Sequence, residues 1–219
     1  MTGSATLKAA EALRELIFKG ILPPGSDHLE AELADRLGLS RTPVREALAR
    51  LEAQGLVSIR PRRGARVIGL SARDMDDVYE ILTALEATAA ARAAALRPAD
   101  AALSPMERAI EEMDRALEIG DLDVWAAADE AFHSALVTLS GNGRLIEAAA
   151  IYADQVRRAR MITLRLRPPP HRSNEDHRAV LAAIRAGDSD LAHRLHAGHR
   201  EAARKLLTDL IRTHQLNQV

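Results

Sequence analysis

The sequence has no cysteine and few aromatic residues, and these absences exclude several classes of protein. Without cysteine, the 219-residue chain can form neither disulfide bonds nor a thiolate metal site, which fits a reducing compartment. No run approaches the roughly 18 consecutive apolar residues of a membrane span, and the N-terminus lacks the basic and apolar regions of a signal peptide. We therefore expect a cytoplasmic protein with no membrane partner.

The composition favours helices over sheets. Apolar residues make up 47 % of the chain but aromatic residues only 2 %, so alanine and leucine supply most of the core. Close-packed helices suit these residue types better than strands do. The length allows two ordinary domains. We expect a mainly α-helical protein.

Positive charge is concentrated in one segment, although the formal net charge of the chain is only −1. Residues 36–66 contain eight arginines and two acidic residues, which gives this segment a net charge of +6 and leaves −7 for the rest. Such an asymmetry suggests one domain that faces DNA and one that does not. A solvated arginine-rich surface is the alternative.

Two helices joined by a short turn are predicted within this N-terminal third. Leu29, Leu33 and Leu37 recur every four residues, and Gly38 is suited to end a helix. After Ser40 or Thr42, either of which could cap it, a second helix carries apolar residues at i, i+3, i+4 and i+7: Val44, Ala47, Leu48 and Leu51. Two helices around a glycine-containing turn form the helix-turn-helix pattern.

A β-hairpin is predicted directly after these helices. The β-prone runs 56–60 and 65–68 flank the turn Pro61–Gly64. A hairpin at this position would be the wing of a winged helix, with Arg62, Arg63 and Gly64 at its tip. The first domain is therefore predicted to span residues 1–70.

The second helix presents residues suited to DNA. Thr42 and Arg45 lie opposite its apolar face, and Arg41 is at its N-terminal end. Helix N-termini contact phosphates and base edges, and arginine can read guanine O6 and N7. The alternative is that these exposed arginines only keep the surface soluble, but the order of helix, turn, helix and wing favours DNA binding. The predicted DNA-binding residues are Arg41, Thr42, Arg45, Arg62, Arg63 and Gly64.

This region resembles the GntR family of bacterial winged-helix regulators. The matching segments are LEAELA (29–34), SRTPVREAL (40–48), LEAQGLV (51–57) and RGARV (63–67). The resemblance implies a homodimer that binds double-stranded operator DNA. Some relatives contact DNA through an arginine at the position of Ala31, so we expect that contact to be missing.

The second predicted domain, residues 71–219, reads as an all-helical bundle of about six helices. The predicted helices span about 74–96, 102–119, 122–139, 143–165, 173–186 and 189–212. Glycine and proline residues separate them, for example Gly120 and Pro168–Pro170.

Four polar residues of this domain share the apolar faces of their helices. Asp129 and His133 lie with Trp125 and Phe132, whereas His177 and His199 lie on two later helices. A buried carboxylate without a partner is costly, and a shared divalent metal would keep it ionised. Imidazole and carboxylate ligands suit Zn, Ni, Mn or Fe, of which we favour Zn. The alternative is a set of hydrogen-bonded core histidines. The remaining histidines are expected to be non-ligands: His28, His171, His193, His196 and His214.

The second domain is similar to the FCD effector-binding domain of the FadR-like branch. The matching segments are DEAFH (129–133), LSGN (139–142), EDHRAVLAAIRAGD (175–188) and His199. Many FCD domains bind a divalent metal through one aspartate and three histidines, and the matching residues are Asp129, His133, His177 and His199. Many relatives carry an arginine where this chain has Leu82.

A small carboxylic acid is the expected effector. Arg160 shares a face with Leu145 and Val156, and Arg92 shares a face with Val78. An inward-facing arginine could bind a carboxylate with two hydrogen bonds, although a structural salt bridge, for instance with Glu86, is the alternative. The candidate effector-binding residues are Arg160, Arg92 and Asn142, the last of which lies in the matching segment 139–142.

The sequence thus predicts an effector-responsive DNA-binding transcription regulator, a repressor rather than an enzyme. A metalloenzyme with Glu130 or Glu175 as base is less consistent with four protein ligands, because catalytic sites usually keep a position open. An adaptor protein with a vestigial helix-turn-helix is the other alternative.

Overall fold

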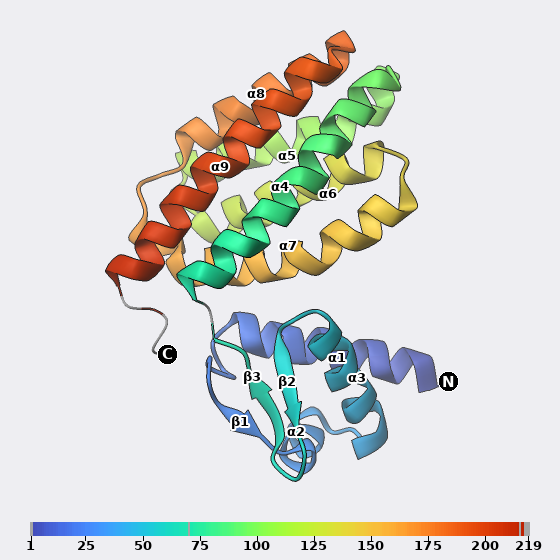
Figure 1. The fold of residues 1–219 in the computed structure, drawn as a ribbon, viewed down its shortest axis with the longest axis vertical. Helices are drawn as coiled ribbons and strands as arrows, with labels where there is room; N and C mark the ends of the chain where they lie inside the picture. The colour runs from blue at the N-terminus through green and yellow to red at the C-terminus, as the bar shows by residue number, and fades with distance from the viewer. Residues whose placement is uncertain (1, 70, 215, 217–219) are drawn as a thin grey trace. The chain divides into compact units, whose positions relative to one another are not determined.

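The computed structural model describes residues 2–69, 71–214 and 216. The chain divides between Ser71 and Ala72 into two compact units, each described here by itself. Helices dominate, and among the described residues strands occur only in the N-terminal unit (Figure 1), which confirms the predicted fold class. No helix in the described ranges is both long and apolar enough to cross a membrane.

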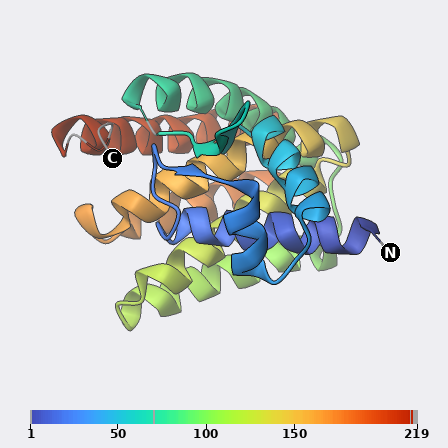
Figure 2. The same ribbon diagram turned by 90° about the horizontal axis from the view of Figure 1, so that it is seen from below.

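The N-terminal unit contains the predicted helix-turn-helix and wing. Its elements are α1 (Thr2–Phe18), β1 (Asp27–His28), α2 (Glu30–Leu37), α3 (Arg41–Ala53), β2 (Val57–Arg60) and β3 (Gly64–Val67). The strands form an antiparallel sheet in the order β1-β3-β2. Figure 2 shows the same elements turned by 90°. The strand β1 was not predicted, because two polar residues carry no alternating pattern.

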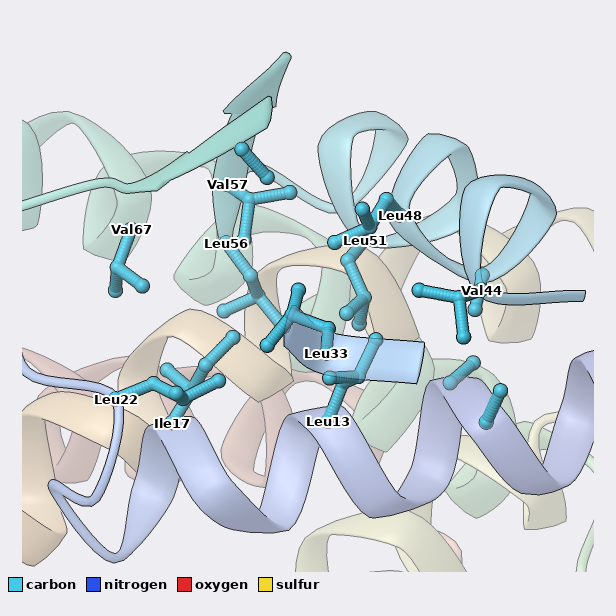
Figure 3. Close-up of a cluster of buried hydrophobic side chains, with 14 of the residues drawn as sticks. Leu13, Ile17, Leu22, Leu33, Val44, Leu48, Leu51, Leu56, Val57 and Val67 are labelled. Atoms are coloured by element: carbon cyan, nitrogen blue, oxygen red, sulfur yellow. The ribbon is translucent and has the colours of Figure 1, made fainter. Parts of the chain in front are cut away.

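Apolar side chains from all three helices and the hairpin form one core in this unit. Leu13 of α1, Leu51 of α3 and Leu56 before β2 are at most 1 % exposed. Leu33 and Val67 close the core from α2 and β3 (Figure 3). The core therefore fixes α3 on its apolar face and leaves the opposite face to solvent.

The ends of α2 and α3 set the short turn between them. Gly38 has φ +64°, and its N–H donates to the carbonyls of Ala34 and Asp35, which satisfies the end of α2. Ser40 is the N-cap residue of α3, but its side chain makes no capping hydrogen bond. The expectation of a side-chain cap there is therefore wrong for Ser40, and Thr42 lies inside the helix instead.

The C-terminal unit is a bundle of six α-helices and one short 3₁₀ helix. The elements are α4 (Ala72–Ala95), α5 (Asp100–Glu118), α6 (Leu122–Leu139), α7 (Gly143–Thr163), η1 (Leu164–Leu166), α8 (His171–Ala186) and α9 (Ser189–Thr213). The helices α4 and α9 pack side by side along their length in both views (Figures 1 and 2). The six predicted helices are confirmed.

The bundle core mixes large apolar side chains with buried polar ones. Trp125, Phe132 and Leu136 of α6 are at most 1 % exposed, as are Tyr79 and Leu82 of α4. The indole Nε1 of Trp125 donates to Asn174 Oδ1 at 2.9 Å, which links α6 to α8. Buried polar residues from α4, α6, α7, α8 and α9 are the candidates for function.

Candidate functional site

Four of the predicted polar residues converge inside the bundle. Each of Asp129, His133, His177 and His199 offers one ligand atom, and these atoms lie within 4.8 Å of one another. All four residues are at most 7 % exposed. His133 Nε2 lies 3.3 Å from His177 Nε2, and the two carboxylate oxygens of Asp129 each lie 3.7 Å from one of these nitrogens.

Helical spacing explains how three elements supply this cluster. Asp129 and His133 are one turn apart on α6, so their side chains point to the same side. His177 lies on the buried face of α8 with Val180, and His199 lies on α9. The two rings of His177 and His199 have centroids 4.4 Å apart.

The environment keeps the imidazoles neutral and the carboxylate charged. Burial lowers the pKa of both His133 and His177 well below the usual range, and neighbouring positive charges lower it further. Burial alone would raise the pKa of Asp129, but Arg160 and the histidines outweigh it and lower that pKa. Neutral imidazoles and an ionised carboxylate are the protonation states that bind a metal.

Arg160 reaches the cluster from α7. Its Nη1 lies 2.5 Å from Asp129 Oδ2, and the residue is 7 % exposed. The sequence predicted an inward-facing Arg160, and the structure places it beside Asp129. The alternative partner considered for an inward arginine, Glu86, is bound by a different residue.

Glu86 forms a second polar group that the sequence reading missed. Its carboxylate accepts hydrogen bonds from Arg200 Nε at 2.5 Å, Arg200 Nη2 at 2.6 Å and His196 Nε2 at 2.8 Å. His196, which the sequence predicts to be a non-ligand, is fully buried. Glu86, His133 and His196 also have ligand atoms within 4.8 Å of one another.

Arg92 and Asn142 lie in neither polar group. Arg92 is exposed, and its Nε donates to the carbonyl of Ser140 at 2.8 Å. Asn142 is the N-cap residue of α7, where its Oδ1 accepts from the N–H groups of Arg144 and Leu145. Their contacts thus join helix ends, and the expectation that Arg92 faces inward is wrong.

Two further polar side chains near Asp129 were also missed. The hydroxyl of Tyr79 is fully buried and has no hydrogen-bond partner among the described residues. The same holds for Nε and Nη2 of Arg167, whose guanidinium carbon lies 4.9 Å from the centroid of the Trp125 ring. Burial and the neighbouring Arg160 lower the pKa of Arg167 to about 10. Unpaired buried donors of this kind are suited to binding a ligand.

The predicted DNA-facing residues of α3 are accessible. Arg41 and Thr42 are exposed in the first turn of the helix. The Arg45 side chain is 68 % exposed, and its guanidinium makes a bidentate pair with Glu30 of α2, at 2.8 Å for Nη2 to Oε2. The structure thus leaves this end of α3 open, with Glu30 holding Arg45 in place.

The wing places Arg62 and Arg63 at an exposed tip. The turn closes by a hydrogen bond from the N–H of Arg63 to the carbonyl of Arg60, and Arg62 has φ +64°. Gly64 has a structural reason to be glycine, because a Cβ there would lie 2.1 Å from the carbonyl oxygen of His28. The β1 strand therefore crosses the wing too closely for any side chain at residue 64.

Two protein families match consecutive parts of the chain. The family of bacterial regulatory proteins called gntR matches residues 5–67, and the FCD domain matches residues 77–211. A relative from Agrobacterium vitis, named as an HTH-type transcriptional regulator in the TAR-I ttuE-ttuC' intergenic region, is 47 % identical over 131 residues, which are 59 % of this chain and 77 % of that protein.

Other relatives extend the similarity along most of the chain. The "Probable D-xylose utilization operon transcriptional repressor" of Paenarthrobacter nicotinovorans is 34 % identical and covers 80 % of this chain and 76 % of its own. The structure of McbR/YncC from E. coli superposes with a TM-score of 0.79 at 25 % identity, over 93 % of this chain and 96 % of that one. These relatives are transcriptional regulators and not enzymes. The chain therefore belongs to the GntR family of helix-turn-helix transcription regulators and carries an FCD domain after its DNA-binding region.

Proposed function

We propose that this protein is a repressor whose bundle binds a divalent metal and, beside it, a small carboxylic acid that controls binding to operator DNA. The convergence of Asp129, His133, His177 and His199 in one buried cluster carries this proposal. Residues 1–70 would bind DNA and residues 71–219 would bind metal and effector. A regulator of chromosomal genes would act in the cytoplasm.

The donor set fits a metal better than it fits a hydrogen-bonded core. The Nε2 atoms of His133 and His177 face each other at 3.3 Å, and each also lies 3.7 Å from an oxygen of Asp129, so lone-pair atoms of three residues are directed at one another. Three nitrogens and one carboxylate oxygen suit Zn²⁺, with Ni, Mn or Fe as alternatives. When bound, the metal would act as a Lewis acid toward an oxygen of the effector.

Cationic and hydroxyl groups next to this cluster favour an anionic effector. Arg160 is paired with Asp129, so its remaining donors could bind a carboxylate. Arg167 and the Tyr79 hydroxyl offer further buried donors without partners among the described residues. Leu82, at the position of the arginine in many relatives, is fully buried and apolar. Arg160 and Arg167 would replace that arginine.

The DNA-binding residues would be those left exposed on α3 and the wing. Arg41, Thr42 and Arg45 would contact phosphates and base edges in the major groove. Arg62 and Arg63 would contact the backbone or the minor groove. A homodimer would place two such surfaces on a two-fold operator. The effector can release DNA only if it binds the DNA-competent and the incompetent conformations with different affinities.

A thermal-shift experiment tests the metal and the effector together. The metal-free protein and the protein loaded with Zn²⁺ are heated with a panel of small carboxylic acids and sugar acids. We expect Zn²⁺ to raise the melting temperature, and one class of acid to raise it further only when metal is present. Arg160→Ala should abolish the second shift, whereas the control variant Arg92→Ala, at an exposed residue, should retain it.

Two results would count against the proposal. If Zn²⁺ and the other candidate metals give no shift, the cluster is a hydrogen-bonded core and not a metal site. If Arg160→Ala retains the full response to the active acid, Arg160 does not contact the effector. If Arg92→Ala instead loses the response to the acid, Arg92 contributes to effector binding.

A further inference from the structure

Glu86 lies on the opposite side of His133 from the four-residue cluster. His133 Nε2 faces Asp129 and His177, whereas His133 Nδ1 lies 3.3 Å from Glu86 Oε2. This buried Nδ1 makes no hydrogen bond that meets strict geometric criteria among the described residues, and Glu86 Oε2, at 3.3 Å, is the acceptor that the structure places within its reach. The two nitrogens of one imidazole thus connect two polar groups.

The position of the Glu86 carboxylate is fixed from α9. Arg200 binds both carboxylate oxygens, and His196 donates to Oε2, so three nitrogen donors hold a residue that is 1 % exposed. His196 and Arg200 are one turn apart on α9, and α9 packs along α4, which carries Glu86. A carboxylate bound on both oxygens cannot turn away from His133.

We propose that Glu86, held by Arg200 and His196, is a positioning residue that accepts the Nδ1–H of His133 and so leaves Nε2 as the metal-binding nitrogen. A histidine that binds a metal usually donates its other N–H to such an acceptor, which fixes the tautomer and the ring orientation. This role rests on the metal site proposed above. The proposal thus assigns a supporting role at the metal site to three residues that do not bind the metal themselves: Glu86 of α4, and His196 and Arg200 of α9.

A second metal ion bound by Glu86, His133 and His196 is the competing interpretation. These three residues have suitable ligand atoms within 4.8 Å of one another. However, the guanidinium of Arg200 already binds both oxygens of Glu86, whereas Arg160 contacts only Oδ2 of Asp129 and leaves Oδ1 available to a metal. The occupied oxygens of Glu86 therefore favour a supporting role over a second metal site.

The test compares zinc binding by the full-length protein and three variants. Glu86→Gln replaces the charged acceptor with a weaker neutral one. The double variant Glu86→Leu/Arg200→Met removes both charges together, which avoids leaving an unpaired buried ion that could prevent folding. Thr208→Val is the matched control, because Thr208 is buried on α9 and, within the described part of the chain, its hydroxyl bonds to carbonyls of its own helix alone.

We expect one Zn²⁺ per wild-type chain, measured by competition with a chromophoric chelator. The zinc affinity should fall about 10- to 100-fold in Glu86→Gln and in the double variant, and should stay unchanged in Thr208→Val. Wild-type zinc affinity in the folded Glu86 variants would overturn the positioning role while leaving the metal site intact. Two Zn²⁺ ions per wild-type chain would overturn it in favour of a second site.

A spectroscopic measurement tests the same role without metal. Nitrogen-15 NMR of the histidine rings in the metal-free protein should show the Nδ1–H tautomer for His133, identified by the loss of its signals in His133→Gln. The double variant should lose this preference. An Nε2–H tautomer in the wild-type protein would overturn the inference. If the wild-type protein binds no Zn²⁺ at all, the proposed metal site is wrong, and the positioning role that depends on it is wrong as well.

Discussion

Buried ionisable side chains define the chemistry of the bundle at the scale of single residues. Asp129 and Glu86 are each at most 2 % exposed, and each has an arginine on its carboxylate. Breaking such a buried pair leaves an uncompensated charge, which typically costs about 3–5 kcal/mol. Arg160 therefore compensates the buried charge of Asp129 in this structure.

The buried histidines should make the metal-free bundle sensitive to acid. Burial lowers the pKa of His133, His177 and His196, so the folded state resists protons that the unfolded state accepts below about pH 6.5. Stability is then lost as the pH falls below this value, by about 1.4 kcal/mol per pH unit for each such proton. The lowered pKa values of Asp129 and Glu86 act in the same direction at still lower pH.

Urea unfolding at pH 7, 6 and 5 can measure this dependence. Trp125 is the single tryptophan of the chain and is buried in the bundle, so its fluorescence reports that unit alone. His196→Gln should reduce the pH dependence by about one proton, and the exposed His193→Ala should not change it. A free energy of unfolding that stays constant from pH 7 to pH 5 would contradict the neutral, buried state of these rings.

At the scale of an element, the wing shows how the close approach of one strand to another requires glycine at residue 64. Its strand β3 lies between β1 and β2, and the pair His28 and Ala65 brings β1 against the start of β3. Gly64 has φ +79°, and a Cβ would meet backbone atoms of both His28 and Leu29 at less than 3 Å. Backbone atoms cannot move aside as a flexible side chain could.

Gly64→Ala should therefore destabilise the N-terminal unit by about 1–3 kcal/mol, because strain in the left-handed region adds to the clash with β1. Circular dichroism should show a lower melting temperature for this unit, while the fluorescence transition of Trp125 stays in place. Gly69→Ala is the control, since a Cβ there would have no neighbour within 4 Å. Equal melting of Gly64→Ala and the wild type would show that β1 does not hold the wing.

The separation of charge along the chain matters at the scale of the whole molecule. The positive segment 36–66 covers the end of α2, α3 and the wing, and the remainder of the chain is negative. Proteins that neutralise several phosphates release counterions, so their affinity for DNA falls steeply with salt. A chain with a net charge of only −1 therefore still contains a positively charged segment suited to binding DNA.

We expect binding to a duplex from the gene's own promoter region to weaken by roughly three orders of magnitude between 50 and 200 mM salt. Arg41→Ala should reduce the slope of log affinity against log salt by about one unit, because one phosphate contact is lost. Fluorescence anisotropy measures both quantities, with Arg108→Ala, an exposed residue of α5, as control. An unchanged slope in Arg41→Ala would exclude this residue as a phosphate contact.

The sequence by itself determined the helix-turn-helix, the wing hairpin and the six helices of the bundle. It also identified the inward positions of Asp129, His133 and His177, because a helix with large apolar residues at regular spacing has only one face that can be buried. His199 is buried as expected, but Leu206, two helical turns further along the same side of α9, is 38 % exposed. The apolar face of α9 was therefore only partly predicted.

The tertiary structure alone decided which polar residues meet. Alanines lie on every side of α4, so its apolar pattern does not select a face, and the inward prediction for Arg92 failed for this reason. Glu86 on α4 is separated in the sequence from both His196 and Arg200 on α9 by more than 100 residues. Their contact depends on how α4 and α9 pack against each other. The periodicity of a sequence shows which face of a helix is buried, but it does not show which other helix covers that face.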